Sequence, residues 1–189
     1  KSGVNIALLL LQANGLRNVK VEETRGMLSD HYDPRKKILR LSKDVYRNSS
    51  VSAMGIVAHE VGHALQDNKG YVPMKIRGAL VPVANTGTWL GYVCFLLGIF
   101  LSIANLVWAG VVLFSAAVLF ALITLPVEFN ASVQARQMLK SNGLVTAAES
   151  DGVSAVLSAA ALTYVAALLQ AVSSLLYHIF IATGMSRKE

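Results

Sequence analysis

Cysteine is almost absent from this sequence of 189 residues, in which Cys94 stands alone. A single cysteine cannot form an intramolecular disulfide, and Cys94 falls in a long apolar segment, where we expect no thiol chemistry. Structural zinc sites are closed by four protein ligands that are usually rich in cysteine. The sequence therefore offers neither a disulfide framework nor a cysteine-rich structural metal site.

Charged residues are also scarce, at 15% of the sequence against 54% hydrophobic residues. No charged side chain occurs from Ala79 to Val127 or from Val153 to Ser186, and the second of these segments contains one histidine, His178. A helix needs about 20 apolar residues to span a bilayer, so the first segment has room for two spanning helices and the second for one. The sequence thus predicts a multi-pass protein of the cell membrane, with a helical hairpin and one further transmembrane helix.

The net charge of +6 comes mostly from residues 1–78. Basic and acidic residues alternate there and flank the apolar segments, whereas a nucleic-acid-binding surface would show a basic stripe with interleaved aromatic residues. We therefore expect a solvated protein face beside a lipid bilayer, and no nucleic-acid partner.

An H-E-x-x-H motif, formed by His59, Glu60 and His63, lies inside the apolar, helix-compatible run Val51–Gln66. On a helix, residues four apart lie on one face, about 6 Å apart along the axis, so both imidazoles can bind one metal ion. Glu60 can lean toward a metal-bound water, take its proton and pass it to a leaving amine. The alternative is a buried helix with satisfied histidines, but these side chains need a partner in an apolar helix, and a metal is the simplest one.

A catalytic zinc site keeps three protein ligands and an open position for water, so the motif requires one more ligand. Glu128 directly follows the predicted hairpin. The short turn of the hairpin returns both of its ends to the side of the metal helix, by which we mean the predicted helix that carries His59 and His63. Glu128 also opens an amphipathic helix that runs toward Asn142-Gly143. We expect Glu128 to be the third ligand, and the alternative is that it is only the first polar residue at the membrane surface.

Asp151, in the pair Asp151-Gly152 at the head of the last apolar segment, is a second candidate for the third ligand. Site-2-type intramembrane proteases take this ligand from an Asp-Gly motif, but their H-E-x-x-H motif lies in a spanning helix. The apolar run Val51–Leu65 is short for a span. We therefore favour Glu128 and expect Asp151 to cap a helix.

The residues before the motif predict a helix at Gly3–Gln12, a strand at Val19–Thr24, a loop at Arg25–Lys36 and a second strand at Lys37–Ser42. The two strands would form a small sheet. Lys37–Ser42 is a candidate edge to which a substrate peptide could add as a further strand, although an ordinary paired strand fits the pattern equally well. In the loop, His31 and Tyr32 are candidate donors to the oxyanion of a tetrahedral intermediate.

These patterns together predict a mainly α membrane protein with a small α+β, zincin-like catalytic domain. We expect the H-E-x-x-H helix in a domain of residues 1–78, the transmembrane hairpin in 79–127, the third-ligand helix and a loop in 128–150, and a C-terminal transmembrane helix and tail in 151–189. Lysine and arginine residues flank the spans on the side of the metal helix, which the positive-inside rule assigns to the cytoplasm. They are Lys69, Lys75, Arg77, Arg136 and Lys140, whereas the hairpin turn has none and the C-terminal tail beyond the last span has Arg187 and Lys188.

An H-E-x-x-H helix, a hydrophobic hairpin and then E-F-x-A-S resemble the membrane zinc peptidases of the HtpX and CAAX-protease type. Over most of its length the sequence is more similar to the YugP-like neutral zinc metallopeptidases, through Val21–Gly26, Leu28–Pro34 and Ala58–Ala64. Members of that family look to carry an N-terminal spanning helix, whereas this sequence begins at Lys1 without one and without a signal peptide, which suggests a processed or trimmed product.

The resemblance implies that His59, His63 and Glu128 bind one Zn²⁺ per chain and that Glu60 is the catalytic base. Ser132 stands where the larger group has an aspartate, so a carboxylate that would orient a histidine is missing. We expect a membrane-anchored zinc-dependent endopeptidase that hydrolyses a peptide or membrane-protein substrate by Glu60-assisted attack of a zinc-bound water.

Two alternatives to this function remain at the level of the sequence. One is a non-catalytic membrane scaffold with a structural zinc, and the other is a site-2-type intramembrane protease that uses Asp151. The sequence does not identify the substrate, and a regulatory protein partner that gates access is compatible with it.

Overall fold

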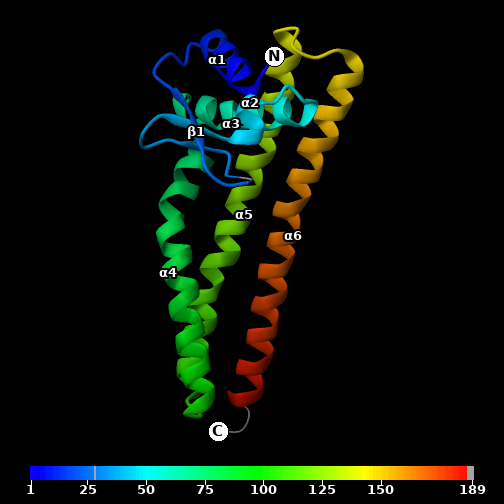
Figure 1. Ribbon diagram of the computed structural model, residues 1–189. Helices are drawn as coiled ribbons and strands as arrows, with labels where there is room; N and C mark the ends of the chain where they lie inside the picture. The colour runs from blue at the N-terminus through cyan, green and yellow to red at the C-terminus, as the bar shows by residue number, and fades with distance from the viewer. Residues whose placement is uncertain (28, 187–189) are drawn as a thin grey trace. The chain divides into compact units, whose positions relative to one another are not determined.

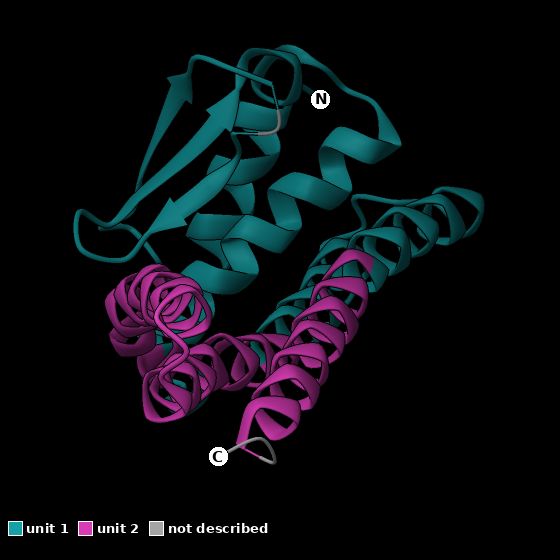
Figure 2. Cartoon of the chain, turned by 90° about the horizontal axis from the view of Figure 1, so that it is seen from below, with its two compact units in different colours: residues 1–74, 127–162 teal, residues 75–126, 163–189 magenta. Residues whose placement is uncertain are grey.

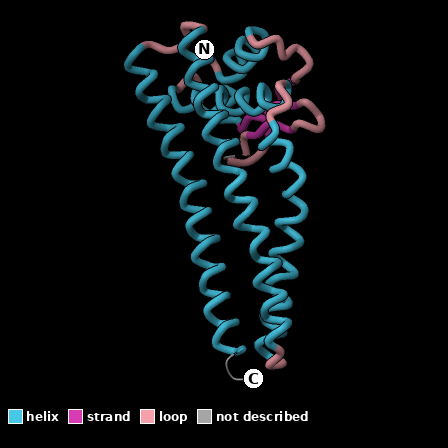
Figure 3. Tube along the Cα trace, turned by 180° about the vertical axis from the view of Figure 1, so that it is seen from behind, coloured by secondary structure: helices cyan, strands magenta, loops and turns pink. Residues whose placement is uncertain are grey.

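The computed structural model describes residues 1–27 and 29–186, so Leu28, Arg187 and Lys188 lie outside the described residues. Helices make up most of the described chain, and its strands are short (Figure 3). The chain divides into two compact units, which Figure 2 shows in different colours. Unit 1 consists of residues 1–74 and 127–162, and unit 2 of residues 75–126 and 163–189. Each unit has its own hydrophobic core.

Unit 1 contains a three-stranded sheet formed by β1 (Lys20–Thr24), β2 (His31–Asp33) and β3 (Ile38–Ser42). The strand order is β1-β3-β2, with β1 parallel and β2 antiparallel to β3. Two predictions are therefore wrong. The segment Arg25–Lys36, expected to be a loop, contains strand β2, and Lys37–Ser42, expected to be a candidate edge, becomes the central strand.

The burial of β3 explains why it is central. Leu39 and Leu41 are completely buried in the core of unit 1, and partners on both sides protect the backbone of this strand from water. Strand β2 has only three residues and ends just before Pro34, so it shows too little alternation to be read from the sequence. The consequence is that β2, rather than β3, is the edge strand that lies against the helix of the H-E-x-x-H motif.

Three helices complete the N-terminal part of unit 1: α1 (Gly3–Ala13), α2 (Lys43–Arg47) and α3 (Val51–Asn68). The H-E-x-x-H motif lies on α3, as predicted. Ser50 caps this helix, because its hydroxyl accepts a hydrogen bond of 3.1 Å from the backbone N–H of Ala53. The buried face of α3 packs on α1, which anchors α3 in the core of unit 1.

Among the described residues, three helices are long and apolar enough to cross a membrane: α4 (Val72–Phe100), α5 (Ala104–Ser141) and α6 (Ala147–Ser186) (Figure 1). The prediction of three such helices is confirmed. The turn between α4 and α5 falls at residues 101–103, where Ser102 has a positive φ of 55°. Helix α5 then continues without a break through Pro126 to Ser141, so one helix carries both an apolar span and the segment that contains Glu128.

Within unit 2, α4 and α5 pack closely because glycine lies at their contact. A Cβ atom added to Gly110 would stand 2.8 Å from the backbone oxygen of Gly91, so a larger residue would force the two helices apart. His178 of α6 is buried between aromatic rings, with ring centroids 4.3 Å from those of Phe95 and of Phe114. The last apolar helix therefore packs on the hairpin through its one histidine.

Helix α6 begins with a capping box. The backbone N–H and the hydroxyl of Thr146 both donate 2.8 Å hydrogen bonds to Glu149, whose own N–H faces the Thr146 hydroxyl at 3.3 Å. Asp151 is exposed in the following residues. The expectation that Asp151 caps the helix is wrong, because α6 already begins at Ala147 and Asp151 lies inside it, after the capping box of Thr146 and Glu149.

Candidate metal centre

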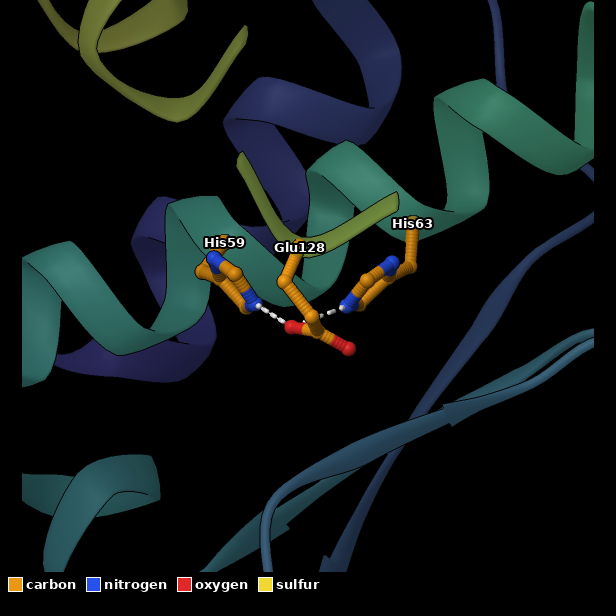
Figure 4. A group of neighbouring side chains, drawn as sticks. All are labelled: His59, His63 and Glu128. Carbon is orange, nitrogen blue, oxygen red and sulfur yellow. Dashed lines mark hydrogen bonds and ion pairs between the residues drawn. The ribbon is translucent and has the colours of Figure 1, made fainter. Parts of the chain in front are cut away.

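Three predicted ligands come together in unit 1. His59 and His63 project from one face of α3, and Glu128 projects toward them from α5 (Figure 4). The Oε2 atom of Glu128 lies 3.0 Å from Nε2 of His59 and 3.5 Å from Nε2 of His63. A ligand atom from each residue lies within 4.8 Å of the other two, and this is the group of potential ligands found among the described residues.

The close crossing of α3 and α5 makes this geometry possible. Gly62, between the two histidines in sequence, faces the backbone of Ala131 on α5. A Cβ atom on Gly62 would stand 2.8 Å from the Ala131 oxygen, where real Cβ atoms are essentially never found. The glycine inside the H-E-x-x-H motif thus lets α5 approach closely enough for Glu128 to reach the histidines.

The second nitrogen of each imidazole also has a partner. Nδ1 of His59 lies 3.2 Å from the hydroxyl of Ser132, and Nδ1 of His63 lies 3.0 Å from Oε1 of Gln66. These contacts leave Nε2 of both rings facing Glu128. Metal-binding histidines in proteins are oriented in this way, through their other ring nitrogen.

The carboxylate of Glu128 is a buried charge, because the residue is only 2% exposed. Burial lowers the pKa of His63, but the hydrogen bond to Glu128 and the charges of Glu60 and Glu128 outweigh this effect and raise the pKa above its ordinary value. The carboxylates thus favour a positive charge at His63, and the same field favours a bound cation.

The carboxylate of Glu60 is held by the edge strand β2. The backbone N–H of Tyr32 donates a 3.0 Å hydrogen bond to Oε2 of Glu60. The phenol of Tyr32 donates a 2.6 Å hydrogen bond to Asp67, two turns further along α3, and Lys37 forms an ion pair with the same carboxylate. Strand β2 is therefore fixed to the metal helix at two points seven residues apart.

The other sequence candidates lie elsewhere. The Tyr32 hydroxyl is engaged by Asp67, and His31 is exposed, with Nδ1 2.7 Å from the Ser29 carbonyl. Asp151 is exposed on α6 and is not one of the three clustered ligands. Sequence reasoning missed Gln66, although it stands seven residues after His59 and three after His63, a spacing that places all three on one helical face.

The residues present fit a zinc ion. Two imidazole nitrogens and one carboxylate oxygen are a donor set that zinc binds, and three protein ligands leave one position open, as in catalytic sites. The distances of 3.0 and 3.5 Å from Oε2 of Glu128 to the two imidazole nitrogens are close to those of atoms that each lie about 2 Å from a shared tetrahedral ion. The group as a whole lies within 4.8 Å, so zinc binding would draw it slightly closer together. Fold and site together define a helical protein with the ligand set of a mononuclear zinc hydrolase.

Comparison with known proteins agrees with this class. The chain belongs to the family described as "Putative neutral zinc metallopeptidase", which matches residues 1–183. It is 48% identical over 181 residues to a Bacillus subtilis (strain 168) protein named "Putative membrane protease YugP", and the match covers 96% of this chain and 80% of that protein. No solved structure matches the chain.

Proposed function

We propose that this chain is a membrane-anchored endopeptidase that holds one zinc ion with His59, His63 and Glu128 and uses Glu60 as its catalytic base. The observation that carries the proposal is the convergence of three ligand atoms within 4.8 Å beside a helix that also presents Glu60. The zinc metallopeptidase family and the relative that is named a membrane protease support the same activity.

Zinc in such a site polarises a carbonyl group and lowers the pKa of a bound water toward about 7. Glu60 then receives the proton of the attacking water and delivers it to the leaving amine. The Tyr32 N–H holds one oxygen of the Glu60 carboxylate and leaves the other oxygen for the water. Because this donor is part of a strand, the orientation of the base depends on the position of β2.

The edge of β2 offers a place for an extended substrate. An edge strand presents backbone groups to which a peptide can add through main-chain hydrogen bonds, and β2 is the edge strand fixed to the metal helix. The N–H of Tyr32 is already donated to Glu60, and Pro34, which follows β2 directly, has no N–H, so the pairing is limited to a few backbone groups. We therefore propose a substrate held by a short stretch of extended chain next to the scissile bond.

The sequence of α5 favours cleavage close to a membrane surface. Its charge-free part ends at Val127, and the next residue is the proposed ligand Glu128. At 1.5 Å per residue, the apolar residues that begin at Ala104 are long enough to cross the roughly 30 Å of hydrocarbon in a bilayer. Glu128 would then lie within about one turn of the bilayer edge, within reach of bonds near the membrane in a membrane-protein substrate.

We further propose a multi-pass topology with the metal centre on the cytoplasmic side, because lysines and arginines flank the spans on that side. The test places a single cysteine at Ser102, in the turn between α4 and α5, in a Cys94→Ser background. An impermeant thiol reagent added to intact cells is expected to label it. Protection from outside the cell, with labelling after lysis, would reverse the topology.

The two alternatives have less support. A structural zinc would need a fourth protein ligand, whereas the group found among the described residues offers three. A site-2-type enzyme would need its H-E-x-x-H helix in a span, but α3 is not one of the three candidate spans, and Asp151 is exposed. Both observations favour the surface endopeptidase.

Glu60→Gln is the decisive variant for the mechanism, because it keeps the shape of the side chain and removes the base. We expect zinc content equal to that of the wild type, measured by metal analysis in detergent, together with loss of cleavage of a fluorescent unfolded protein substrate. Glu128→Ala is the matched control and should lose both zinc and cleavage. Cleavage at the wild-type rate by Glu60→Gln would refute the proposed role of this residue.

A further inference from the structure

Gln66 is the most completely buried polar side chain next to the proposed ligands. It lies on α3 three residues after His63 and is 1% exposed. A buried amide must satisfy two N–H donors and a carbonyl oxygen inside the protein. Gln66 does so entirely with residues of the metal centre and of α5.

The partners of Gln66 fix which way its amide points. Nε2 donates a 2.8 Å hydrogen bond to the backbone carbonyl of Val127 and a 2.9 Å hydrogen bond to Oδ1 of Asn130. Oxygen and nitrogen of an amide are assigned from such networks, and a backbone carbonyl can only accept. Turning the amide over would place its oxygen against two acceptors, so Oε1 must face Nδ1 of His63, at 3.0 Å.

This orientation decides which nitrogen of His63 carries the proton. Because Oε1 of Gln66 can only accept, Nδ1 of the ring must donate. In the neutral imidazole the lone pair then lies on Nε2, the atom that faces Glu128 at 3.5 Å. The ring is therefore held in the tautomer that a metal ligand requires.

We propose that Gln66 is a positioning residue that holds His63 as the Nδ1–H tautomer and aims Nε2 at the metal ion. The inference rests on the proposed function in so far as His63 binds a metal. Val127 and Asn130 flank Glu128 in sequence, so the turn of α5 that supplies the third ligand also orients the second one. His59 has a different arrangement, since its Nδ1 faces only the hydroxyl of Ser132, which can donate or accept.

The first test uses the wild-type protein and needs no substrate. Zinc-loaded protein labelled with ¹⁵N-histidine is studied by NMR in detergent, and the nitrogen that carries the proton is read for each zinc-bound ring. We expect a proton on Nδ1 of His63, protected from exchange with solvent. A proton on Nε2 of His63 would overturn the inference without reference to any variant.

The second test compares zinc affinities by competition with a chelator. Gln66→Leu removes the acceptor and is expected to weaken zinc binding about 10- to 100-fold, the usual effect of losing the partner of a metal-binding histidine. Gln66→Glu keeps an acceptor for Nδ1 of His63 but loses the donors to Val127 and Asn130, so it should recover only part of that loss. Gln134→Leu is the control: Gln134 contacts Asn130 but neither histidine, so its zinc affinity should stay that of the wild type.

The outcomes separate this inference from the proposed function. Absence of zinc from the wild-type protein would refute the proposed function itself. Wild-type affinity in Gln66→Leu would refute the role of Gln66 and leave the function standing. Equal losses in Gln66→Leu and in the control Gln134→Leu would mean that any disturbance of the contact between α3 and α5 weakens zinc binding, which also refutes positioning of His63. If Gln66→Leu fails to fold, the tautomer in the wild-type protein decides.

Discussion

Gly62→Ala tests whether the close crossing of α3 and α5 builds the metal centre. The added Cβ would lie 2.8 Å from the oxygen, 3.2 Å from the Cα and 3.3 Å from the carbonyl carbon of Ala131. All three are backbone atoms, so no side chain can turn aside to make room. Since carbon atoms pack at about 3.5 to 4.0 Å, α5 must move away from α3 by roughly half an ångström or more.

That movement acts directly on the third ligand, because Ala131 lies less than one turn after Glu128 on the same helix. Zinc sites keep their ligand distances within about 0.2 Å, so binding would have to pull α5 back against the new methyl group. Overpacking of this kind costs about 1 to 3 kcal/mol. If this whole cost is subtracted from the free energy of zinc binding, the affinity becomes weaker by a factor of between about 5 and about 150.

Gly55→Ala is the matched control on the same helix. Its Cβ would meet only side-chain atoms of Val153 and Val156, at 3.7 and 3.9 Å, which is ordinary contact. Alanine favours a helix over glycine by about 1 kcal/mol, so Gly55→Ala should raise the free energy of unfolding by about that amount. In Gly62→Ala the same gain offsets part of the overpacking, which leaves metal-free stability unchanged or lower by about 2 kcal/mol.

The assay is zinc affinity by chelator competition, with thermal unfolding of the metal-free proteins measured beside it. The expected pattern is weakened zinc binding in Gly62→Ala and wild-type binding in Gly55→Ala. If Gly62→Ala binds zinc as tightly as Gly55→Ala does, the crossing of the two helices does not position Glu128, and the reasoning fails.

Three further predictions concern the surroundings of the site. Ser132→Asp, which gives His59 a carboxylate partner, should tighten zinc binding, and Ser132→Ala should weaken it less than Gln66→Leu does. Zinc affinity is measured by chelator competition, and equal affinities in the two Ser132 variants would refute a role of this residue in orienting His59. Burial and the hydrogen bond to Asp67 raise the pKa of Tyr32, so the folded protein keeps a proton that the unfolded chain loses above pH of about 10. Stability should therefore fall as the pH rises above about 10 in the wild type, and less in Tyr32→Phe, as followed by unfolding at several pH values; equal losses in both proteins would contradict this. Because the pKa of His63 is raised, zinc must displace its proton, so affinity should fall as the pH is lowered through neutrality, with proton release detectable by calorimetry in buffers of different ionisation enthalpy; a pH-independent affinity would argue against His63 as a ligand.

The parts of the site that follow from local spacing could be predicted from the sequence. His59 and His63 share a face because helix geometry places them there, and Glu128 follows from a short turn that must return the chain to its starting side. The structure brings these three side chains together. Their roles as ligands, and that of Glu60 as base, stay predictions until zinc is measured.

The parts that depend on tertiary packing could not be predicted in the same way. Strand β2 is recognisable only through its pairing with β3, since three residues before Pro34 carry no periodic signal. The central place of β3 depends on partners from both sides, and the sequence suggested only one. Gln66 looks like an ordinary polar residue near a helix end, and its role emerges only when Val127 and Asn130 of a distant helix lie next to it.

The separation of the ligands along the chain has a consequence for the synthesis of the protein. The sequence positions of His59 and Glu128 differ by 69, and the whole of the hairpin formed by α4 and α5 lies between them. A ribosome therefore finishes the two histidines well before it makes the residue that completes the set. Under the proposed function, the nascent chain would in that interval hold two of the proposed ligands and the proposed base without the third ligand, so cleavage would have to wait until the hairpin has been made and Glu128 follows it. The order of synthesis itself would thus keep the proposed enzyme inactive until residue 128 has been added.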